Sequence, residues 1–529
     1  MTNIDKKVID IKKFRNILIP RLDTFGDIVL LQGFIQALLD FLPEARITIL
    51  VRQGYEQLAS VFPNRLIWKT TRIHPYKEPP DIPAIKLLSY ELRQESYDLL
   101  LTTTYNRAWS DELIAAVLIS THRVALGDAN DDHEILTKIL PELGAVMPEH
   151  LYDQYIPVEE KIHETEKYQL FWNKITSEKK NIPPPQLVIP EIESTRAGDV
   201  LTRAGLKKGK FVFCFPAGVS NVSLKTWPEE NFAQVVAHLE KKYSLRTLIA
   251  AHESEKEIVD KVVDLARKKG ANPEIWLGKD GDVPLACALA AQSYFYLGND
   301  TGMMHMAAAL GKPIIAIFGG GTWPRFLPCT NVGRIFVTLL PCFYCRWNCI
   351  FNEPFCINFV SADAVKNEIE AMLNDLNRGT EVFKVVECVP DPERLYKVLE
   401  NIFEQIDKLT GLLKKSEADR VSRLGQIDEL TRMLKESEAD RAARLEQIME
   451  LTNVLKESEA DRAARLEVIH GLEEKINQIQ NELVQEKKRA DDSEQGWREL
   501  ESAFAVRQAR RIGLIKARKF ASREFTNED

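Results

Sequence analysis

The feature that most constrains the fold is an alternation, repeated twice, of short apolar runs with segments of helical spacing. Residues 16–128 contain β-rich runs such as NILIP, ARITILV, YDLLLTTT and HRVALG, separated by segments such as DIVLLQGFIQALLDFL. This order predicts a parallel sheet covered by helices on both faces. After a bridge at 181–190, NIPPPQLVIP, the pattern restarts with KFVFCFP, RTLIAAH, EIWLG, SYFYLG and PIIAIFG. We therefore expect an α/β protein with two doubly wound domains and a ligand where the carboxyl ends of the sheets face each other.

The length of 529 residues also indicates several domains, because a single core stops growing at roughly 250–300 residues. The predicted boundaries are an N-terminal α/β domain at 1–185, a second α/β domain at 186–378, a linker at 379–400, a coiled coil at 401–495 and a basic tail at 496–529.

The predicted coiled coil rests on a 21-residue repeat that begins with Ser416 in SEADRVSRLGQIDELTRMLKE and returns twice. Twenty-one residues equal three heptads. The apolar seam of the first copy is Ile427, Leu430 and Leu434. In strict register half of the seam positions are Ser or Arg, so the seam shifts locally onto neighbouring Ala and Leu residues or the coil is weak. We expect a homo-oligomer through this helix, with a solitary charged helix as the alternative.

Charge and hydropathy narrow the range of partners. The net charge of −8 gives no general attraction to nucleic acid. The sequence lacks an apolar run of the roughly 20 residues that a membrane helix needs, and its start, MTNIDKKVIDIKKF, lacks the apolar core of a signal peptide. We expect a cytoplasmic protein. The tail FAVRQARRIGLIKARKF is either a solvated terminus or a peripheral contact with the inner face of a membrane.

The stretch YLGNDTGMMHMAAALGKPIIAIFGG reads as strand, loop, helix, loop and strand. The backbone N–H groups of Thr301, Gly302 and Met303 at the helix start would bind an anion such as a diphosphate. His305 lies in the same first turn, where it would reach a phosphate or a sugar hydroxyl. The alternative is a helix cap made by Asp300 or Thr301, with His305 packed in the core.

A second candidate site lies in the loop that joins the first strand to its helix, ILIPRLDTFGDIVL, from Arg21 to Asp27. Gly26 permits a close approach of the backbone, and Asp27 would project toward the second domain. A carboxylate at this place can accept the proton of a hydroxyl group. The alternative is a helix-capping Asp. The loop lacks G-x-G-x-x-G spacing, which disfavours a nicotinamide cofactor.

Two further charged residues follow strands of the second domain. Lys225, in FPAGVSNVSLKTWPEENF, would neutralise charge on a diphosphate leaving group. Glu255, just after TLIAAH, would accept hydrogen bonds from a ribose. A solvated loop Lys and a surface Glu at a helix start are the respective alternatives.

Together these motifs resemble glycosyltransferase family 9, the ADP-heptose:lipopolysaccharide heptosyltransferase-like enzymes, over roughly residues 15–375. The resemblance implies a GT-B fold of two Rossmann-like domains, the first for the acceptor and the second for the nucleotide-sugar donor. It implies inverting transfer without a metal or other cofactor. Asp27 matches the family's general base, Lys225 the Lys beside the donor diphosphate, and Thr301, Gly302 and His305 the donor-binding block. Glu255 matches the ribose-binding acid, with Glu253 and Glu257 as rivals.

The function that the resemblance implies is transfer of heptose or a similar sugar, from ADP-heptose or a similar donor, to a hydroxyl of lipopolysaccharide, a surface glycan or a lipid-linked acceptor. Alternatives are a scaffold of glycan assembly with a degenerate transferase domain, and a related epimerase or phosphorylase. Asp23 and Phe25 stand where the family usually has small residues, and FGGGTWPRF carries extra Gly and a Trp. These differences leave the acceptor and the donor sugar open.

Four cysteines cluster in PCFYCRWNCIFNEPFC with the spacing C-x2-C-x3-C-x6-C. These are Cys342, Cys345, Cys349 and Cys356. Their thiolates would suit a structural zinc ion. Reduced or disulfide-paired structural thiols and redox chemistry are the alternatives.

Overall fold

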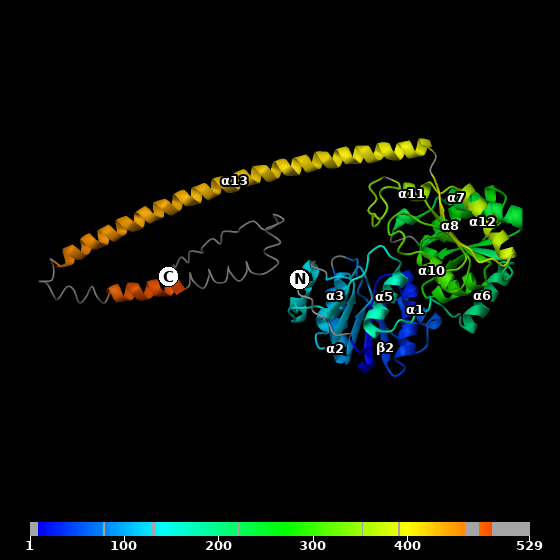
Figure 1. Cartoon of the computed structure of the whole chain (residues 1–529), viewed down its shortest axis with the longest axis horizontal. Coiled ribbons are helices and arrows are strands. Elements are labelled where there is room, and N and C mark those ends of the chain that lie inside the picture. Colours follow the sequence, from blue (N-terminus) through cyan, green and yellow to red (C-terminus); the bar gives the residue numbers. More distant parts are fainter. Residues whose placement is uncertain are drawn as a thin grey trace, which may run out of the picture. The chain divides into compact units, whose positions relative to one another are not determined.

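The computed structural model describes residues 9–77, 80–129, 133–218, 222–351, 353–389, 392–460 and 475–488. The chain divides into two compact units, Met1–Gln405 and Ile406–Asp529. The first unit contains two parallel sheets, and the described residues of the second unit are helical (Figure 1).

The first sheet has six parallel strands in the order β3-β2-β1-β4-β5-β6. The central strands are buried along almost their whole length, as is typical of parallel sheets covered on both faces. The strands are β1 (Asn16–Arg21), β2 (Arg46–Arg52), β3 (Ile67–Thr71), β4 (Leu99–Thr102), β5 (His122–Leu126) and β6 (Gln154–Ile156). The helices are α1 (Phe25–Phe41), α2 (Ile82–Gln94), α3 (Trp109–Val117), α4 (Glu134–Ile139) and α5 (Glu164–Thr176), with short 3-10 turns η1 (Ile11–Lys13), η2 (Tyr55–Val61) and η3 (Leu140–Leu143).

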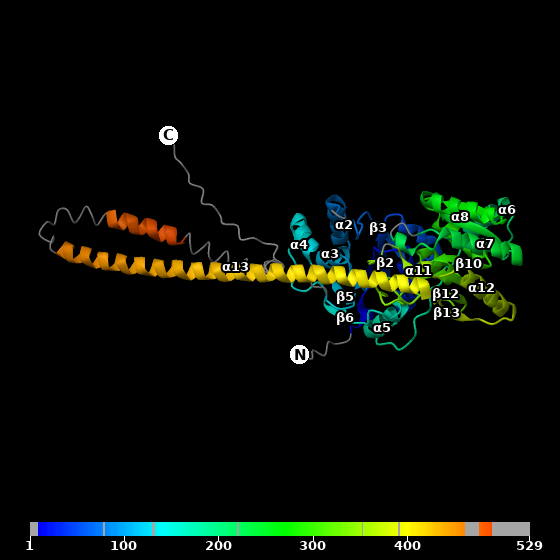
Figure 2. The ribbon, with the colours of Figure 1, turned by 90° about the horizontal axis from the view of Figure 1, so that it is seen from above.

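The second sheet has seven parallel strands in the order β13-β12-β11-β10-β7-β8-β9. On one side of it α7 contacts both α8 and α12 (Figure 2). The strands are β7 (Phe211–Phe215), β8 (Arg246–His252), β9 (Glu274–Gly278), β10 (Phe295–Asn299), β11 (Ile314–Ile317), β12 (Gly333–Val337) and β13 (Phe383–Glu387). The helices are α6 (Glu191–Arg203), α7 (Glu229–Tyr243), α8 (Lys256–Lys268), α9 (Val283–Gln292), α10 (Gly302–Ala309), α11 (Phe355–Asn358) and α12 (Ala362–Asn377), with η4 (Ser223–Lys225) and η5 (Glu253–Glu255).

Both sheets reverse their strand order at one place, between β1 and β4 in the first and between β7 and β10 in the second. Loops at such switch points are where doubly wound folds bind ligands. The prediction of two Rossmann-like, doubly wound domains is confirmed. The segment predicted as a linker, 379–400, carries β13 and the first residues of a long helix, α13 (Pro392–Ala460).

The bridge between the domains packs along α1. A side chain at Gly33 of α1 would overlap the carbonyl oxygen of Pro183, so this close approach requires glycine. Gln186 donates its N–H to the side chain of Gln32 at 2.7 Å, and Leu187 donates its N–H to the carbonyl of Ala309 at 3.1 Å. The bridge therefore links α1 of the first domain to α10 of the second.

Helix α13 presents the predicted apolar seam to solvent. Its side chains at the seam positions are at least half exposed, and these include Leu424, Ile427, Leu430, Leu434, Leu445, Ile448 and Leu451. Intrahelical ion pairs join Asp419 to Arg423 and Asp440 to Arg444. Self-association through this helix stays a prediction, and the predicted basic tail lies outside the described residues. Among the described helices, none is long and apolar enough to cross a membrane.

Candidate active site

The loop after β1 places Asp27 in the first turn of α1. The Thr24 N–H and hydroxyl both donate to Oδ2 of Asp27, at 3.2 and 2.6 Å. The N-cap residue is therefore Thr24 rather than Asp27, and Asp27 takes part in the cap as the N3 residue of a capping box. The other oxygen, Oδ1, lies 3.5 Å from Nη2 of Arg21. Oδ2 of Asp27 is therefore used in the helix cap, whereas Oδ1 has only the Arg21 guanidinium near it among the described contacts.

Arg21 is buried, and besides Asp27 it pairs with Asp23 and lies within electrostatic range of Asp111. Its Nη2 is 2.9 Å from Oδ2 of Asp23, closer than it is to Asp27. Burial raises the pKa of Asp23 well above its usual range, Arg21 opposes this effect, and the charges of Asp27 and Asp111 add to it. Burial also raises the pKa of Asp111 to about 6. On this side of the site the pKa values of Asp23 and Asp111 are therefore higher than those of ordinary Asp side chains.

Asp111 was missed by sequence reasoning. It lies in the first turn of α3, where it accepts the N–H of Ala108 at 2.9 Å and the Thr104 hydroxyl at 3.4 Å. The signal was an acidic residue in the first turn of a helix that follows the buried strand LLLT. Since the carboxyl ends of neighbouring parallel strands meet at one edge, β1 and β4 bring Asp27 and Asp111 to the same place.

Helix α10 begins directly after β10, with Thr301 as its extended N-cap residue. The N–H groups at 301–303 precede the first hydrogen bonds of the helix ladder. His305 is 5% exposed, and burial lowers its pKa to about 4, against the opposing charges of Asp300 and Asp27. Within the described part of the chain its Nδ1 has no hydrogen-bond partner. A neutral imidazole with an unused nitrogen therefore lies beside the helix start.

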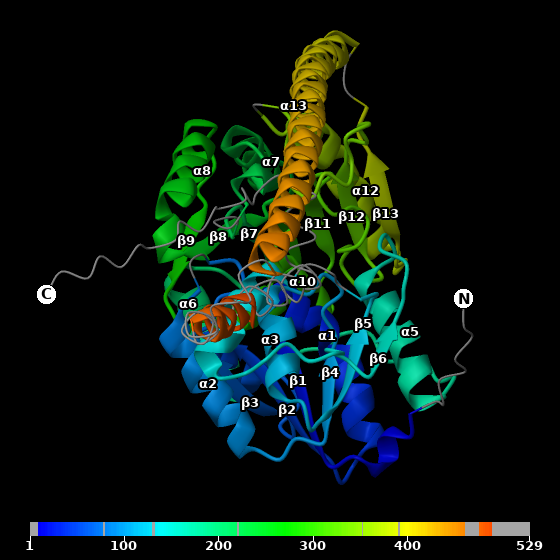
Figure 3. The ribbon, with the colours of Figure 1, turned by 90° about the vertical axis from the view of Figure 1, so that its left-hand side faces the viewer.

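The first turns of α1 and α10 are in contact, and two glycines make this contact. A Cβ at Gly26 would lie 2.9 Å from Cδ2 of His305 and 3.3 Å from Cα of Gly302. A Cβ at Gly302 would lie 3.1 Å from the Gly26 nitrogen. Figure 3 shows α1 and α10 between the two sheets. The structure thus brings together two sequence motifs that are separated by more than 250 residues.

Lys225, in η4, belongs to the same group. Its Nζ lies 3.0 Å from Oδ2 and 3.2 Å from the carbonyl oxygen of Asp300. It also lies 4.8 Å from the centre of the Trp347 ring. Asp300 is therefore engaged with Lys225, and no side-chain cap of α10 is formed among the described residues.

Of the three neighbouring acids, Glu255 faces the loop that follows β7. Both of its carboxylate oxygens accept the N–H of Gly218 at 3.0 Å. Gly218 has φ +80°, a conformation that favours glycine. Glu257 pairs instead with Lys261 at 3.1 Å.

A buried ion cluster crosses the domain boundary beside the site, and sequence reasoning missed it. Glu164 and Lys167 of α5 are fully buried and pair at 2.7 Å. Arg325, after β11, bonds to the same Glu164 oxygen through Nε. The Tyr105 ring lies 4.6 Å from Nζ of Lys167 and 5.3 Å from the Arg325 guanidinium. Burial lowers the pKa of Arg325, and nearby carboxylates, including Asp27, raise it. This cation therefore lies within electrostatic range of Asp27.

The four clustered cysteines line one small cavity with Gly320, Phe351 and Phe355. All four are free thiols. Across the described residues, no group of three or more His, Cys, Asp or Glu side chains has an arrangement that would hold a metal ion. The thiols as arranged here do not fit the zinc site that their spacing suggested.

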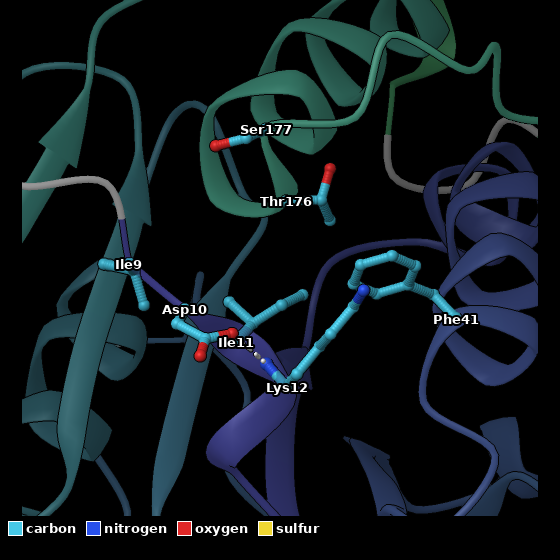
Figure 4. A pocket seen from close by; sticks show the side chains of 7 residues that line it. All are labelled: Ile9, Asp10, Ile11, Lys12, Phe41, Thr176 and Ser177. Carbon is cyan, nitrogen blue, oxygen red and sulfur yellow. Dashed lines mark hydrogen bonds between the residues drawn. The ribbon is translucent and has the colours of Figure 1, made fainter.

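A larger surface cavity of about 300 Å³ lies away from these residues (Figure 4). It is lined by Ile9, Asp10, Ile11, Lys12, Phe41, Thr176 and Ser177. Phe41 ends α1, fourteen residues after Asp27, which corresponds to roughly 20 Å along a helix. This cavity contains none of the predicted site residues.

The two Rossmann-like domains, each with a switch-point loop at their contact, define a class of fold, the GT-B fold. Residues 88–348 match the family model of glycosyltransferase family 9 (heptosyltransferase). This part of the chain is thus similar to glycosyltransferase family 9, the family that the sequence motifs resemble.

Curated relatives include the lipooligosaccharide heptosyltransferase 2 of Campylobacter jejuni subsp. jejuni serotype O:6 (strain 81116), which is 23% identical over 169 residues. That match covers 32% of this chain and 53% of the relative, and serotype O:2 gives a similar one. The chain thus spans about half the length of the curated relatives that it matches.

Solved structures support the fold. A family 9 glycosyl transferase from Veillonella parvula DSM 2008 has a TM-score of 0.55 at 18% identity, covering 70% of this chain and all of that one. The ADP-heptose lipopolysaccharide heptosyltransferase II of E. coli has a TM-score of 0.51 at 17% identity, covering 69% of this chain and 99% of its own. At these identities the likeness establishes the GT-B arrangement alone.

Proposed function

We propose that the chain is an inverting glycosyltransferase that moves a sugar from a nucleotide diphosphate sugar to an acceptor hydroxyl without a metal ion. The observation that carries this proposal is the contact between the first turns of α1 and α10. It brings a carboxylate of one domain, Asp27, to a helix N-terminus, a neutral His and a Lys of the other.

Asp27 is the proposed general base. Its Oδ1 takes the proton of the acceptor hydroxyl while that oxygen forms a bond to the anomeric carbon. Attack occurs on the face opposite the nucleotide, so the configuration at this carbon inverts. The sugar carries oxocarbenium-like positive charge in the transition state, as in glycoside hydrolysis.

The donor side stabilises the leaving group. As the bond from the anomeric carbon to the diphosphate oxygen breaks, negative charge grows on the diphosphate. The N–H groups of Thr301, Gly302 and Met303 and the ammonium of Lys225 bind this charge. Lys225 must then exchange part of its contact with Asp300 for the diphosphate. We assign His305 to the donor as a neutral hydrogen-bonding group and Glu255 to the ribose.

Asp300, Thr301 and His305 are each less than 10% exposed, whereas Asp27 and Lys225 are partly exposed. We propose that the starts of α1 and α10 separate to admit the donor to the buried group, and that closure after binding excludes water from the reaction. The proposed place of this motion is the domain boundary formed by α1, α10 and the bridge.

We further propose that the donor is ADP-heptose or a related sugar nucleotide, because similar proteins are heptosyltransferases of lipooligosaccharide and lipopolysaccharide. A bacterial surface glycan or its lipid-linked precursor is the corresponding acceptor. The exposed seam of α13 supports a homo-oligomer formed through this helix.

The test is a screen of nucleotide diphosphate sugars against the purified full chain. A donor at 100 times its dissociation constant adds roughly 2.7 kcal/mol of stability. We expect thermal stabilisation by one donor, with transfer or slow hydrolysis of the same compound. Absence of both for all donors would favour the alternative of a scaffold with a degenerate transferase domain, and epimerised or phosphorolysed products would favour the related GT-B enzymes.

A further inference from the structure

The cysteine-rich segment 342–356 packs against the glycine-rich loop that follows β11. The Tyr344 N–H donates to the carbonyl of Gly320 at 2.6 Å, and the Arg346 N–H donates to that of Gly321 at 2.8 Å. In return the Gly320 N–H donates to Sγ of Cys356 at 3.5 Å. The segment therefore holds the loop after β11 through hydrogen bonds to its backbone. Such bonds are largely independent of side-chain identity.

Two glycines of this loop make room for the Trp347 ring. A Cβ at Gly319 would lie 3.0 Å from the edge of the Trp347 indole, and a Cβ at Gly321 would overlap that ring. Gly320 instead makes room for the Phe343 ring. The indole thus lies directly on the backbone of a loop, FGGGTWPRF, whose extra glycines set this chain apart from the family pattern.

The backbone that delivers Trp347 is strained. Tyr344, Arg346 and Trp347 have φ values of +68°, +51° and +64°, and none of them is glycine. Residues in this conformation persist only where surrounding contacts determine them, and they cluster at functional sites. The two backbone bonds to Gly320 and Gly321 are such contacts.

The same indole lies 4.8 Å from Nζ of Lys225. The face of an aromatic ring attracts an ammonium group electrostatically, without forming an ion pair with it. Among the described bonds and ion pairs, the Lys225 side chain otherwise contacts only Asp300, through its Oδ2 and its carbonyl oxygen. The ring therefore limits where this long side chain lies without using an N–H donor, so the third donor of the ammonium is available to another partner.

We propose that Trp347 is a positioning residue that holds the Lys225 ammonium toward the donor diphosphate, and that the cysteine-rich segment serves to place this ring. The inference rests on the proposed function, because it gives Lys225 the diphosphate as its ligand. It assigns to the segment a mechanical role in donor binding that needs no metal ion.

The experiment measures the affinity of the full-length protein for ADP, UDP and GDP and for the corresponding nucleosides. The variants are Trp347→Leu, which removes the aromatic face, and Trp347→Phe, which keeps one. Trp276→Leu is the matched control, because Trp276 is a half-buried Trp on β9 of the second sheet and is not part of the site. We expect Trp347→Leu to weaken binding of the preferred diphosphate by about 3- to 30-fold, the range of a cation–π contact at a partly buried site. Its affinity for the nucleoside should stay unchanged, and Trp347→Phe should restore most of the loss.

A double-mutant cycle with Lys225→Met separates positioning from a general structural effect. If Trp347 acts through Lys225, Trp347→Leu has no further effect in the Lys225→Met background. Equal loss of diphosphate and nucleoside affinity, additive effects in the cycle, or wild-type diphosphate affinity in Trp347→Leu would each overturn the inference. A wild-type protein that binds none of the three diphosphates would overturn the proposed function itself, a result distinct from these.

Discussion

Replacing Gly26 by Ala tests the contact on which the site is built. The new Cβ would lie 2.9 Å from Cδ2 of His305 and 3.3 Å from a backbone atom of Gly302, so one helix start must move by a few tenths of an ångström. Such overpacking costs about 1–3 kcal/mol. The helix propensity of Ala returns up to about 1 kcal/mol. The net expectation is destabilisation of up to about 3 kcal/mol, with the strain placed beside the proposed base.

The matched control is Gly198→Ala. Gly198 lies inside α6, and a Cβ there meets nothing within 4 Å. This variant should gain about 0.5–1 kcal/mol, because only the propensity effect acts. Urea denaturation gives the two free energies of unfolding, and transfer kinetics give the consequence for activity. Misplacement of catalytic groups by about 1 Å can cost roughly 100-fold, so Gly26→Ala should lose at least about 10-fold in kcat/KM. Equal stabilisation in both variants, with full activity in Gly26→Ala, would refute the contact.

Three further predictions concern buried charges. The folded pKa of Asp111 is about 6, above its unfolded value, so its contribution to stability is present below about pH 4 and is lost as the pH rises through 6. In unfolding curves measured from pH 4 to 8, Asp111→Asn should remove on the order of 1–3 kcal/mol of this loss. An unaltered pH dependence would contradict the burial argument. Arg325→Met leaves Glu164 with Lys167 as its remaining cation and should cost about 3–5 kcal/mol, whereas a loss below about 1 kcal/mol on denaturation would show that the cluster is not buried. Burial lowers the pKa of His305 to about 4, so its contribution to stability is lost as the pH falls from about 6.5 through 4. The histidine NMR signals should include one that is absent in His305→Asn and does not titrate above pH 5. Titration of this signal near pH 6.5 would be the contrary result.

The strand and helix pattern could be predicted from the sequence because each buried strand of a doubly wound fold is recognisable from its own short run of residues. Runs such as LLLT and FYLGN begin with apolar residues and are buried along their whole length, and helices follow them. β13 was missed because its strand, FKVVE, is mostly exposed and contains Lys384 and Glu387. An edge strand of this kind has no clear hydrophobic period.

The places of Asp27 and Lys225 could be predicted because each follows a strand in a recognisable motif, and their catalytic roles stay predictions. The roles of Glu164, Arg325 and Trp347 could not be predicted, because these come from partners more than 100 residues away. The cysteine spacing left a structural zinc ion, structural thiols and redox chemistry open, because spacing alone does not fix the direction of the thiols. In the structure the segment turns through left-handed residues, and the four thiols line a small cavity.

The most direct test of the account is the transfer rate of Asp27→Asn at saturating donor, measured beside Asp40→Asn. Both residues lie on α1, but Asp40 is exposed at the far end and bonds only to Gln36 among the described contacts. Loss of a general base costs typically 100- to 10,000-fold, so Asp27→Asn should lose at least about 100-fold in kcat with donor affinity kept within about 3-fold. Asp40→Asn should match the wild type. A wild-type rate in Asp27→Asn would contradict the assignment of Asp27 as the base and, with it, the proposed mechanism.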